Sequence, residues 1–299
     1  MPFAIRTTIV LACLLYAHGM ATTSAAAQAH ASPLQGQQVI LVTGSTSGLG
    51  REVALRMGAQ GAHVIVHGRD EARGLAVVEQ INSGAGSARF YSADFASFDN
   101  VRSLAASILR DYDRLDCLVN NAGFGSAPDE RWLSEDGHEF RFQVNYLAPF
   151  LLTTLLKERI ISSAPSRIVN VSSLAQSPID WEDVMIENNF SGGRAYGQSK
   201  LAQIGHTFDL HEELSELGVL SNSLHPATYM PTGMVQRLGV TPRATIAEGA
   251  DAVMNLIMGD VEGGQFFNQM TPRRAHPQAY DPESRKRLRV LSARLTQGR

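Results

Sequence analysis

Tyr196 and Lys200 are the two residues whose types and spacing most directly suggest chemistry. Side chains four residues apart lie on the same face of a helix. A phenol, whose pKa is about 10, is a poor base at neutral pH, but a neighbouring ammonium group favours its phenolate form. Such a tyrosine can take a proton from an alcohol or return one to a carbonyl oxygen. A half-buried tyrosine above a surface lysine is the alternative, yet lysine occurs only at positions 157, 200 and 286, which favours the functional interpretation.

A glycine-rich turn lies near the start of the globular sequence. An apolar run precedes it, a helix-compatible segment follows, and a second apolar run begins about twenty residues later, which is the context of a dinucleotide-binding turn. Glycines let the backbone approach a pyrophosphate, and a helix N-terminus supplies free N–H groups. An ordinary loop is the alternative. The residues expected to hold the cofactor here are Gly44, Ser45, Thr46, Ser47, Gly48, Leu49 and Gly50.

The segments that must position these groups alternate in type along the chain. Short apolar runs rich in β-branched residues predict strands at 39–43, 63–67, 88–91, 117–120, 167–171, 220–224 and 265–267. Helical periodicity indicates helices that include 49–60, 71–81, 100–112 and 196–217. Continuous apolar strands between helices are typical of a parallel sheet covered on both faces. We therefore expect an α/β, Rossmann-type doubly wound sheet of about seven strands, in a single domain over residues 34–299.

Three motifs together resemble one family. These are Thr-Gly-x-x-x-Gly-x-Gly from Thr43 to Gly50, Asn-Asn-Ala-Gly from Asn120 to Gly123, and the Tyr-x-x-x-Lys pair. The chain resembles the short-chain dehydrogenase/reductase family through nearly all of its length after residue 36. The stretch 176–193 and the run 280–297 look like the branch of retinol dehydrogenases and WW-domain oxidoreductases.

The resemblance implies a role for several further residues. Catalysis would use Asn145, Ser173, Tyr196 and Lys200, with Ser173 holding the substrate oxygen and Ser172 as its competitor. Asn145 would hold a water between the lysine and solvent, or simply kink a helix. The cofactor would also contact residues at the ends of later strands, namely Asp94, Asn121, Ala122, Gly123, Tyr196, Lys200, Pro226, Thr228 and Thr232.

The end of the second strand bears on the choice of cofactor. An acidic residue there would bind the ribose 2′-hydroxyl of NAD and repel a 2′-phosphate. Gly68 occupies that position, and Arg69, whose planar guanidinium suits a phosphate, follows it. The sequence therefore favours NADP(H) over NAD(H). Alternatively, Arg69 only pairs with Asp70 or Glu71 at the surface.

Two stretches depart from the compact family pattern. Ser173 and Tyr196 are 23 positions apart, and the additional segment 176–193 is expected to rim a substrate pocket. After the sixth strand, His225-Pro226-Ala227-Thr228 replaces the usual Pro-Gly. Residues 230–245, called the lid segment below, would form a mobile cover. Its apolar side chains favour a lipophilic or mid-sized substrate, unless they serve only packing.

Composition narrows the remaining possibilities. A net charge of −3 over 299 residues gives no footprint for nucleic acid, and Cys13 and Cys117 suggest neither a disulfide nor a metal site. Residues 1–33 resemble a signal peptide or anchoring leader, so that the protein would be exported or membrane-anchored; otherwise it would be cytoplasmic. Membrane contact is expected only through this leader.

The function predicted from these features is hydride transfer between a nicotinamide and an alcohol, ketone or aldehyde. A non-catalytic NADP-binding regulator on the same fold is the alternative, and the intact set Asn145, Ser173, Tyr196 and Lys200 argues against it. A lyase or epimerase of this fold would normally have a different glycine spacing. Homo-oligomers occur in the family, and one is compatible with the sequence.

Overall fold

A computed structural model describes residues 31–297, whose strands form one eight-stranded sheet of order β3-β2-β1-β4-β5-β6-β7-β8. The strands from β1 to β7 are parallel, and β8 is antiparallel to β7. The strands are β1 (Val39–Val42), β2 (His63–Gly68), β3 (Ser87–Ser92), β4 (Cys117–Asn120), β5 (Ser166–Val171), β6 (Val219–His225), β7 (Phe266–Asn268) and β8 (Thr271–Pro272). The predicted doubly wound parallel sheet is confirmed. Most of the expected leader, residues 1–33, lies outside the described residues.

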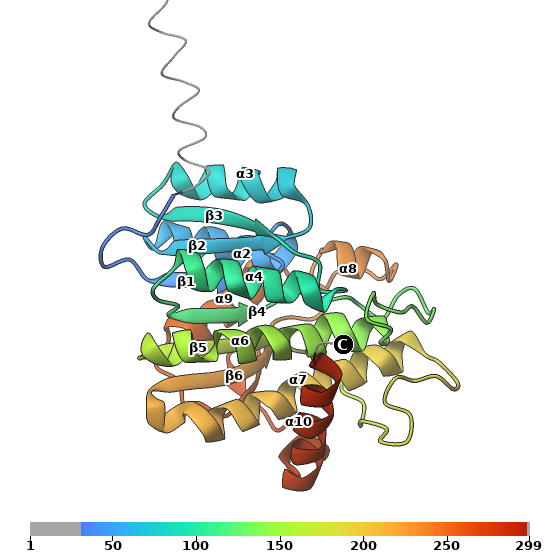
Figure 1. Cartoon of the computed structure of the whole chain (residues 1–299). Helices are drawn as coiled ribbons and strands as arrows, with labels where there is room; N and C mark the ends of the chain where they lie inside the picture. The colour runs from blue at the N-terminus through green and yellow to red at the C-terminus, as the bar shows by residue number, and fades with distance from the viewer. Residues whose placement is uncertain (1–30, 298–299) are drawn as a thin grey trace, which may run out of the picture.

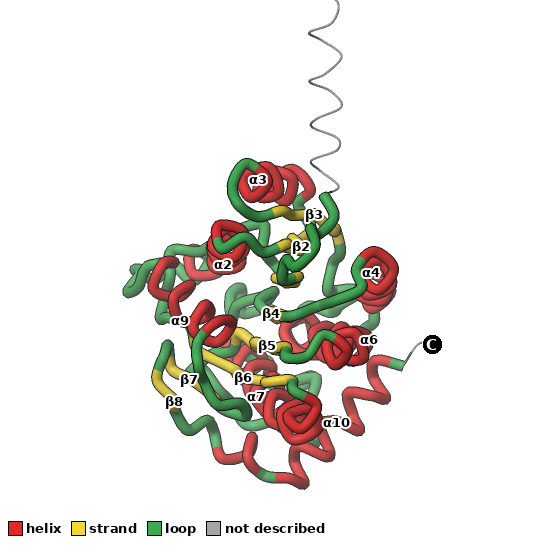
Figure 2. The backbone as a smooth tube through the Cα atoms, turned by 90° about the vertical axis from the view of Figure 1, so that its left-hand side faces the viewer, coloured by secondary structure: helices red, strands yellow, loops and turns green. Residues whose placement is uncertain are grey.

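Helices cover both faces of the sheet (Figures 1 and 2). The main helices are α2 (Gly48–Ala59), α3 (Glu71–Asn82), α4 (Phe98–Asp111), α6 (Ala148–Ser162), α7 (Gly192–Leu214), α9 (Ile246–Met258) and α10 (Pro282–Thr296). Shorter ones are α5 (Phe140–Phe142), the π-turn η1 (Gln143–Leu147), the 3-10 turns η2 (Ser215–Leu217) and η3 (Pro277–Tyr280), and α8 (Gly233–Gln236). Within residues 31–297, no helix has the length and hydropathy needed to span a bilayer.

The alternating side chains of β1 show why its sequence is apolar throughout. Val39 and Leu41 face the core beneath α4, α6 and α7, whereas Ile40 and Val42 face the core beneath α2, α3 and α9. All four side chains are at most 1% exposed. A strand buried on both faces cannot alternate between polar and apolar residues, which makes such runs recognisable in the sequence.

The eighth strand was not predicted from the sequence. β8 comprises only Thr271 and Pro272, both exposed, and it pairs with β7 at the edge of the sheet. A two-residue edge strand buries no apolar side chain and therefore leaves no hydrophobic pattern.

Helix α10 packs against α6, η1 and α7 (Figure 1). Its Arg285 and Arg289 both reach Asp209 of α7, at N–O distances of 3.2 and 2.8 Å. The hydroxyls of Tyr146 and Ser292 are hydrogen-bonded at 2.7 Å. Helix α7, which carries Tyr196 and Lys200 in its first turns, is thus held from the outside by α10.

A chain of buried polar side chains crosses the centre of the sheet. The Nδ2 of Asn120, on β4, donates to Thr153 Oγ1 at 3.1 Å and to Asn170 Oδ1 at 2.9 Å. Asn170, on β5, in turn donates to Thr207 Oγ1 at 3.0 Å. These bonds join α6 to α7 through two adjacent strands, so the first asparagine of the Asn-Asn-Ala-Gly motif stabilises the sheet.

Replacing Asn120 by Leu should lower the free energy of unfolding by about 2 kcal/mol, because Asn170 and Thr153 would each lose a partner in a buried environment. Denaturant titration followed by circular dichroism measures the change. Asn100→Leu, at an exposed position of α4, should change stability by less than about 0.5 kcal/mol. Equal stability of the Asn120→Leu variant and the parent chain would contradict the importance of this chain of bonds.

Candidate active site

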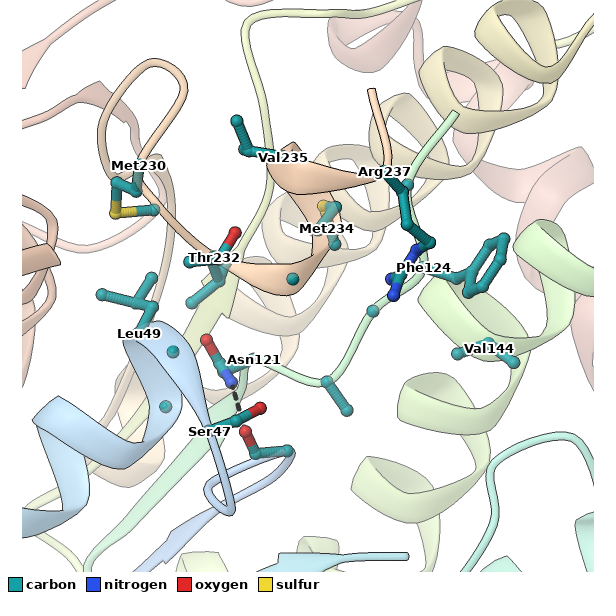
Figure 3. Close-up of a pocket in the computed structure, with 18 of the residues that line it drawn as sticks. Ser47, Leu49, Asn121, Phe124, Val144, Met230, Thr232, Met234, Val235 and Arg237 are labelled. Atoms are coloured by element: carbon teal, nitrogen blue, oxygen red, sulfur yellow. Dashed lines mark hydrogen bonds between the residues drawn. The ribbon is translucent and has the colours of Figure 1, made fainter. Parts of the chain in front are cut away.

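A cavity of about 1080 Å³ opens at the carboxyl ends of the parallel strands. It is lined by the glycine-rich turn after β1, by residues that follow β2 to β6, by the N-terminal part of α7, and by the lid segment. Figure 3 shows the lid segment facing the glycine-rich turn and the segment after β4. Ligands of open α/β sheets bind at this edge, where the connections to the two helical layers diverge.

The glycine-rich turn needs its glycines for close approach. Gly44 has a φ of +65°, and a Cβ there would lie 2.8 Å from Ala122 Cα. A Cβ at Gly50 would lie 2.5 Å from the Gly44 carbonyl oxygen. Thr43 completes the junction, because its hydroxyl accepts hydrogen bonds from the N–H groups of Asn121 and Ala122 at 2.9 and 3.0 Å. The motif after β4 is thereby fixed against the turn after β1.

Most of the residues predicted to bind the cofactor line this one cavity. They are Gly44, Thr46, Ser47, Gly48, Leu49, Gly50, Arg69, Asp94, Asn121, Ala122, Gly123, Tyr196, Lys200, Pro226, Thr228 and Thr232. Ser45 does not, because it is fully buried, with its hydroxyl accepting from the His67 N–H at 3.0 Å. The turn and the cavity are of the kind that holds a dinucleotide, with the N-terminus of α2 directed at the pyrophosphate position.

The four predicted catalytic residues converge beside the cavity. Tyr196 and Lys200 line it, and the Ser173 hydroxyl lies beside the Tyr196 hydroxyl and lowers its pKa. Lys200 Nζ lies 5.8 Å from the centre of the Tyr196 ring. Ser172 also lines the cavity, but its hydroxyl donates to the Lys200 carbonyl oxygen at 2.9 Å. Of the two serines, therefore, Ser173 is the one whose hydroxyl contacts the tyrosine.

Asn145 lies in the π-turn η1, as the helix-kinking interpretation anticipates. Its Oδ1 accepts from the Phe124 N–H at 2.6 Å, and its Nδ2 donates to the Phe124 carbonyl at 3.0 Å and to Ser199 Oγ at 2.9 Å. The side chain thus joins the segment after β4 to the first turns of α7. It lies behind the cavity wall rather than among the lining residues.

Burial sets the protonation of the Tyr196–Lys200 pair. Burial lowers the pKa of Lys200 to about 7, while its Nζ donates to the Val171 carbonyl at 2.8 Å and to Gln203 Oε1 at 3.3 Å. Burial also raises the pKa of Tyr196 above 10, and the hydrogen bond with Ser173 opposes this rise. Desolvation is thus the largest influence on the pKa of the tyrosine, and the Lys200 amine bonds to carbonyl oxygens.

The part of the cavity beside the end of β2, called the ribose end below, is lined by two arginines, Arg69 and Arg73. A Cβ on Gly68 would lie 2.6 Å from Thr46 Cγ2, so the threonine leaves no room for an acidic side chain there. Arg69 pairs with Asp94 at 3.2 Å, rather than with Asp70 or Glu71. Arg73, which was not predicted from the sequence, also lines the cavity. Arg73 lies in the first turn of α3. Whether its side chain faces the cavity depends on how that helix packs, which the sequence does not show.

His67 is a second lining residue that sequence reasoning missed, because its position in a strand gave it no distinguishing pattern. Its Nδ1 accepts from the Gly44 N–H at 3.1 Å, and its ring stacks on Phe95 with centroids 4.7 Å apart. Burial lowers the pKa of His67 to about 4, so the ring is neutral at physiological pH. It holds the glycine-rich turn against the end of β2.

The segment 176–193 is not the pocket rim that was expected, since only Gly193 of this stretch lines the cavity. The segment instead packs on α7 and on η3. The N–H of Asp180 donates to Gln198 Oε1 at 3.0 Å, and the N–H of Ile179 donates to Gln278 Oε1 at 2.6 Å. The lid segment does cover the cavity, with Met230, Thr232 and Met234 among its lining residues (Figure 3).

Comparison with known proteins agrees with this geometry. Residues 38–242 match the family model for short chain dehydrogenase. The chain therefore belongs to the short-chain dehydrogenase/reductase family, and is an oxidoreductase that uses a nicotinamide cofactor and a small-molecule substrate.

Within the family the chain is similar to human retinol dehydrogenases. It is 32% identical to retinol dehydrogenase 13 over 281 residues, covering 86% of this chain and 84% of the relative. Identity to human retinol dehydrogenase 14 is 33% over 287 residues, covering 85% of each.

Two solved structures are similar to this chain in fold. An uncharacterised protein of Mycobacterium paratuberculosis has a TM-score of 0.73 and 28% identity, over 89% of this chain and 95% of that one. A metagenomic short-chain oxidoreductase in complex with NADP has a TM-score of 0.58 and 28% identity, over 73% and 89% of the two chains.

The buried amine of Lys200 should make stability depend on pH in a defined window. Between pH 10.5, the ordinary pKa of lysine, and about pH 7, the folded pKa of Lys200, the amine is protonated in the unfolded chain but neutral in the folded one. The parent chain therefore loses stability as the pH falls through this window. Lys200→Met has no such amine, so its free energy of unfolding should rise relative to that of the parent chain by about 1.4 kcal/mol for each pH unit of this fall. Urea unfolding of both proteins at pH 7, 8 and 9 tests this, since roughly parallel pH profiles would contradict it.

Proposed function

We propose that the protein is an NADP(H)-dependent dehydrogenase/reductase in which Tyr196 is the general acid and base. The observation that carries the proposal is the position of Tyr196 and Lys200 at the wall of a cavity that also contains the glycine-rich turn, with the Ser173 hydroxyl beside that of Tyr196. A substrate oxygen placed between these two hydroxyls would exchange a proton with the first and accept a hydrogen bond from the second.

The cofactor, when bound, supplies the C4 position of nicotinamide as hydride acceptor or donor. In oxidation, the Tyr196 oxygen, in its phenolate form, would take the proton of the alcohol; in reduction, the Tyr196 hydroxyl would give a proton to the carbonyl oxygen. Lys200, with a pKa of about 7, can hold or release a proton close to the tyrosine at physiological pH. Nζ donates to the Val171 carbonyl and lies 5.8 Å from the centre of the Tyr196 ring.

NADP(H) is proposed over NAD(H) because of the ribose end. Arg69 and Arg73, with side chains 64% and 67% exposed, both line the cavity there. Thr46 occupies the space that an acidic side chain at position 68 would need. Two guanidinium groups suit a 2′-phosphate, and one solved relative is itself a complex with NADP. Family membership and the intact set of polar groups favour an enzyme over a cofactor-binding regulator.

Tyr196→Phe should lower kcat for a carbonyl substrate at least about a hundredfold, because the proton donor is removed. The Kd for NADPH, measured by fluorescence titration, should stay within about twofold of that of the parent chain, a difference of less than about 0.5 kcal/mol. Tyr280→Phe, which alters a phenol on η3 outside the cavity, should leave kcat unchanged. Robust turnover by the Tyr196→Phe variant would refute the assignment.

Arg69→Gln should lower kcat/KM for NADPH about tenfold or more, because a charge-assisted contact with the 2′-phosphate is lost. The value for NADH should change far less. Arg110→Gln, at a surface ion pair with Asp111 on α4, is the matched control and should alter neither value. Equal losses with both cofactors would contradict the proposed phosphate contact.

A further inference from the structure

The part of the cavity beyond Gly123 differs from the ribose end. Its wall is formed by the apolar side chains of Phe124, Phe140 and Val144 on one side and of Met234 and Leu238 on the lid segment. The edge of the Phe140 ring meets Phe124, with centroids 5.1 Å apart. These side chains provide a surface suited to a hydrocarbon chain.

A single guanidinium lies at the solvent-exposed rim of this apolar wall. Arg237, just after α8, lines the cavity, and its guanidinium carbon lies 5.3 Å from the centre of the Phe124 ring. Figure 3 shows its side chain extending from the lid segment toward Phe124. The other charged residues in the lining are Lys200 and the ribose-end group Arg69, Asp70, Arg73 and Asp94.

Arg237 also differs in its partners. Arg69 pairs with Asp94, and Arg73 pairs with Asp70. No ion pair or hydrogen bond of the Arg237 side chain occurs among residues 31–297; its guanidinium lies over the Phe124 ring. A guanidinium with no carboxylate partner has N–H groups available to bind a carboxylate in a bidentate manner.

We propose that Arg237 binds an anionic group, a carboxylate in the simplest case, at the end of the substrate distant from the reacting carbon. The substrate would then be an amphipathic carbonyl compound or alcohol, with its carbon chain on Phe140, Val144 and Met234. This inference rests on the proposed function and adds the substrate class.

Two other roles for Arg237 are testable alternatives. In the first, the residue only latches the lid segment to the segment after β4. A latch is already present, because Met234 fills the space beside Gly125, where a Cβ would lie 2.7 Å from Met234 Cγ. In the second, Arg237 binds the cofactor pyrophosphate, but it is Thr232 that faces the glycine-rich turn, with its Cγ2 3.2 Å from the Cβ position of Gly48.

The test uses straight-chain methyl ketones of graded length that end in a carboxylate, each paired with its methyl ester. The parent chain, with NADPH, should reduce the acid of the preferred length with a kcat/KM about tenfold or more above that of the ester, equivalent to about 1.4 kcal/mol. Arg237→Gln should bring this ratio close to unity while changing the value for the ester by less than about twofold. Arg237→Lys should retain part of the preference, because the charge stays but the planar fork is lost.

Arg243→Gln is the matched control. Arg243 is on the same lid segment and its guanidinium likewise lies over a ring, 5.4 Å from the centre of Tyr229, but it does not line the cavity. The acid-to-ester ratio of this variant should equal that of the parent chain.

Three outcomes would overturn the inference. Equal losses for acid and ester in Arg237→Gln would identify a latch, and a raised KM for NADPH would identify a cofactor contact. A parent chain that reduces the esters without preferring any acid would refute the anionic substrate while leaving the proposed function intact. If neither series is reduced, the proposed function fails for these compounds, and titration of the acids and esters into the NADPH complex decides whether Arg237 selects the carboxylate.

Discussion

The junction made by Thr43 is the constraint on which the site depends. Its hydroxyl accepts two N–H groups from the segment after β4 and donates to the Val119 carbonyl at 3.2 Å. This fixes Gly123, where a Cβ would lie 3.2 Å from Asn145 Oδ1 and 3.7 Å from Lys200 Nζ. Asn145 then bonds Ser199 on α7. Through these contacts Thr43 links the glycine-rich turn to α7, the helix that carries Tyr196 and Lys200.

The same region contains groups whose burial opposes folding. Lys200 is 3% exposed and bonds a carbonyl and an amide oxygen instead of a carboxylate, so its charged form is disfavoured. Tyr196 is raised in pKa by the same desolvation. The extensive packing of the sheet between two helical layers offsets these unfavourable terms. The site thus exchanges stability for one group, the Lys200 amine, whose protonation can change near neutral pH.

The sequence was most informative where burial or backbone geometry leaves a pattern. Strands such as β1 are apolar on both faces, and the positions of Gly44 and Gly50 tolerate no side chain, so both features could be predicted. β8 leaves no pattern, being two exposed residues. Other contacts join residues that are distant in the sequence, so residue spacing could not predict them. Examples are the ion pair of Arg69 with Asp94 and the packing of residues 176–193 on α7. The pKa of Tyr196 depends on how deeply the side chain is buried, which is likewise a property of the fold.

The position of α10 has a consequence for how the chain reaches its folded state. Helix α7 presents Asp209 and Glu212 to Arg285 of α10, which follows them by more than seventy positions in the sequence. During synthesis these carboxylates and the neighbouring His206 therefore remain uncovered until the ribosome has produced α10. The strands of the sheet and α7 itself are all synthesised before that point. The ion pairs that hold the outer face of α7 are therefore the last of its contacts to become available.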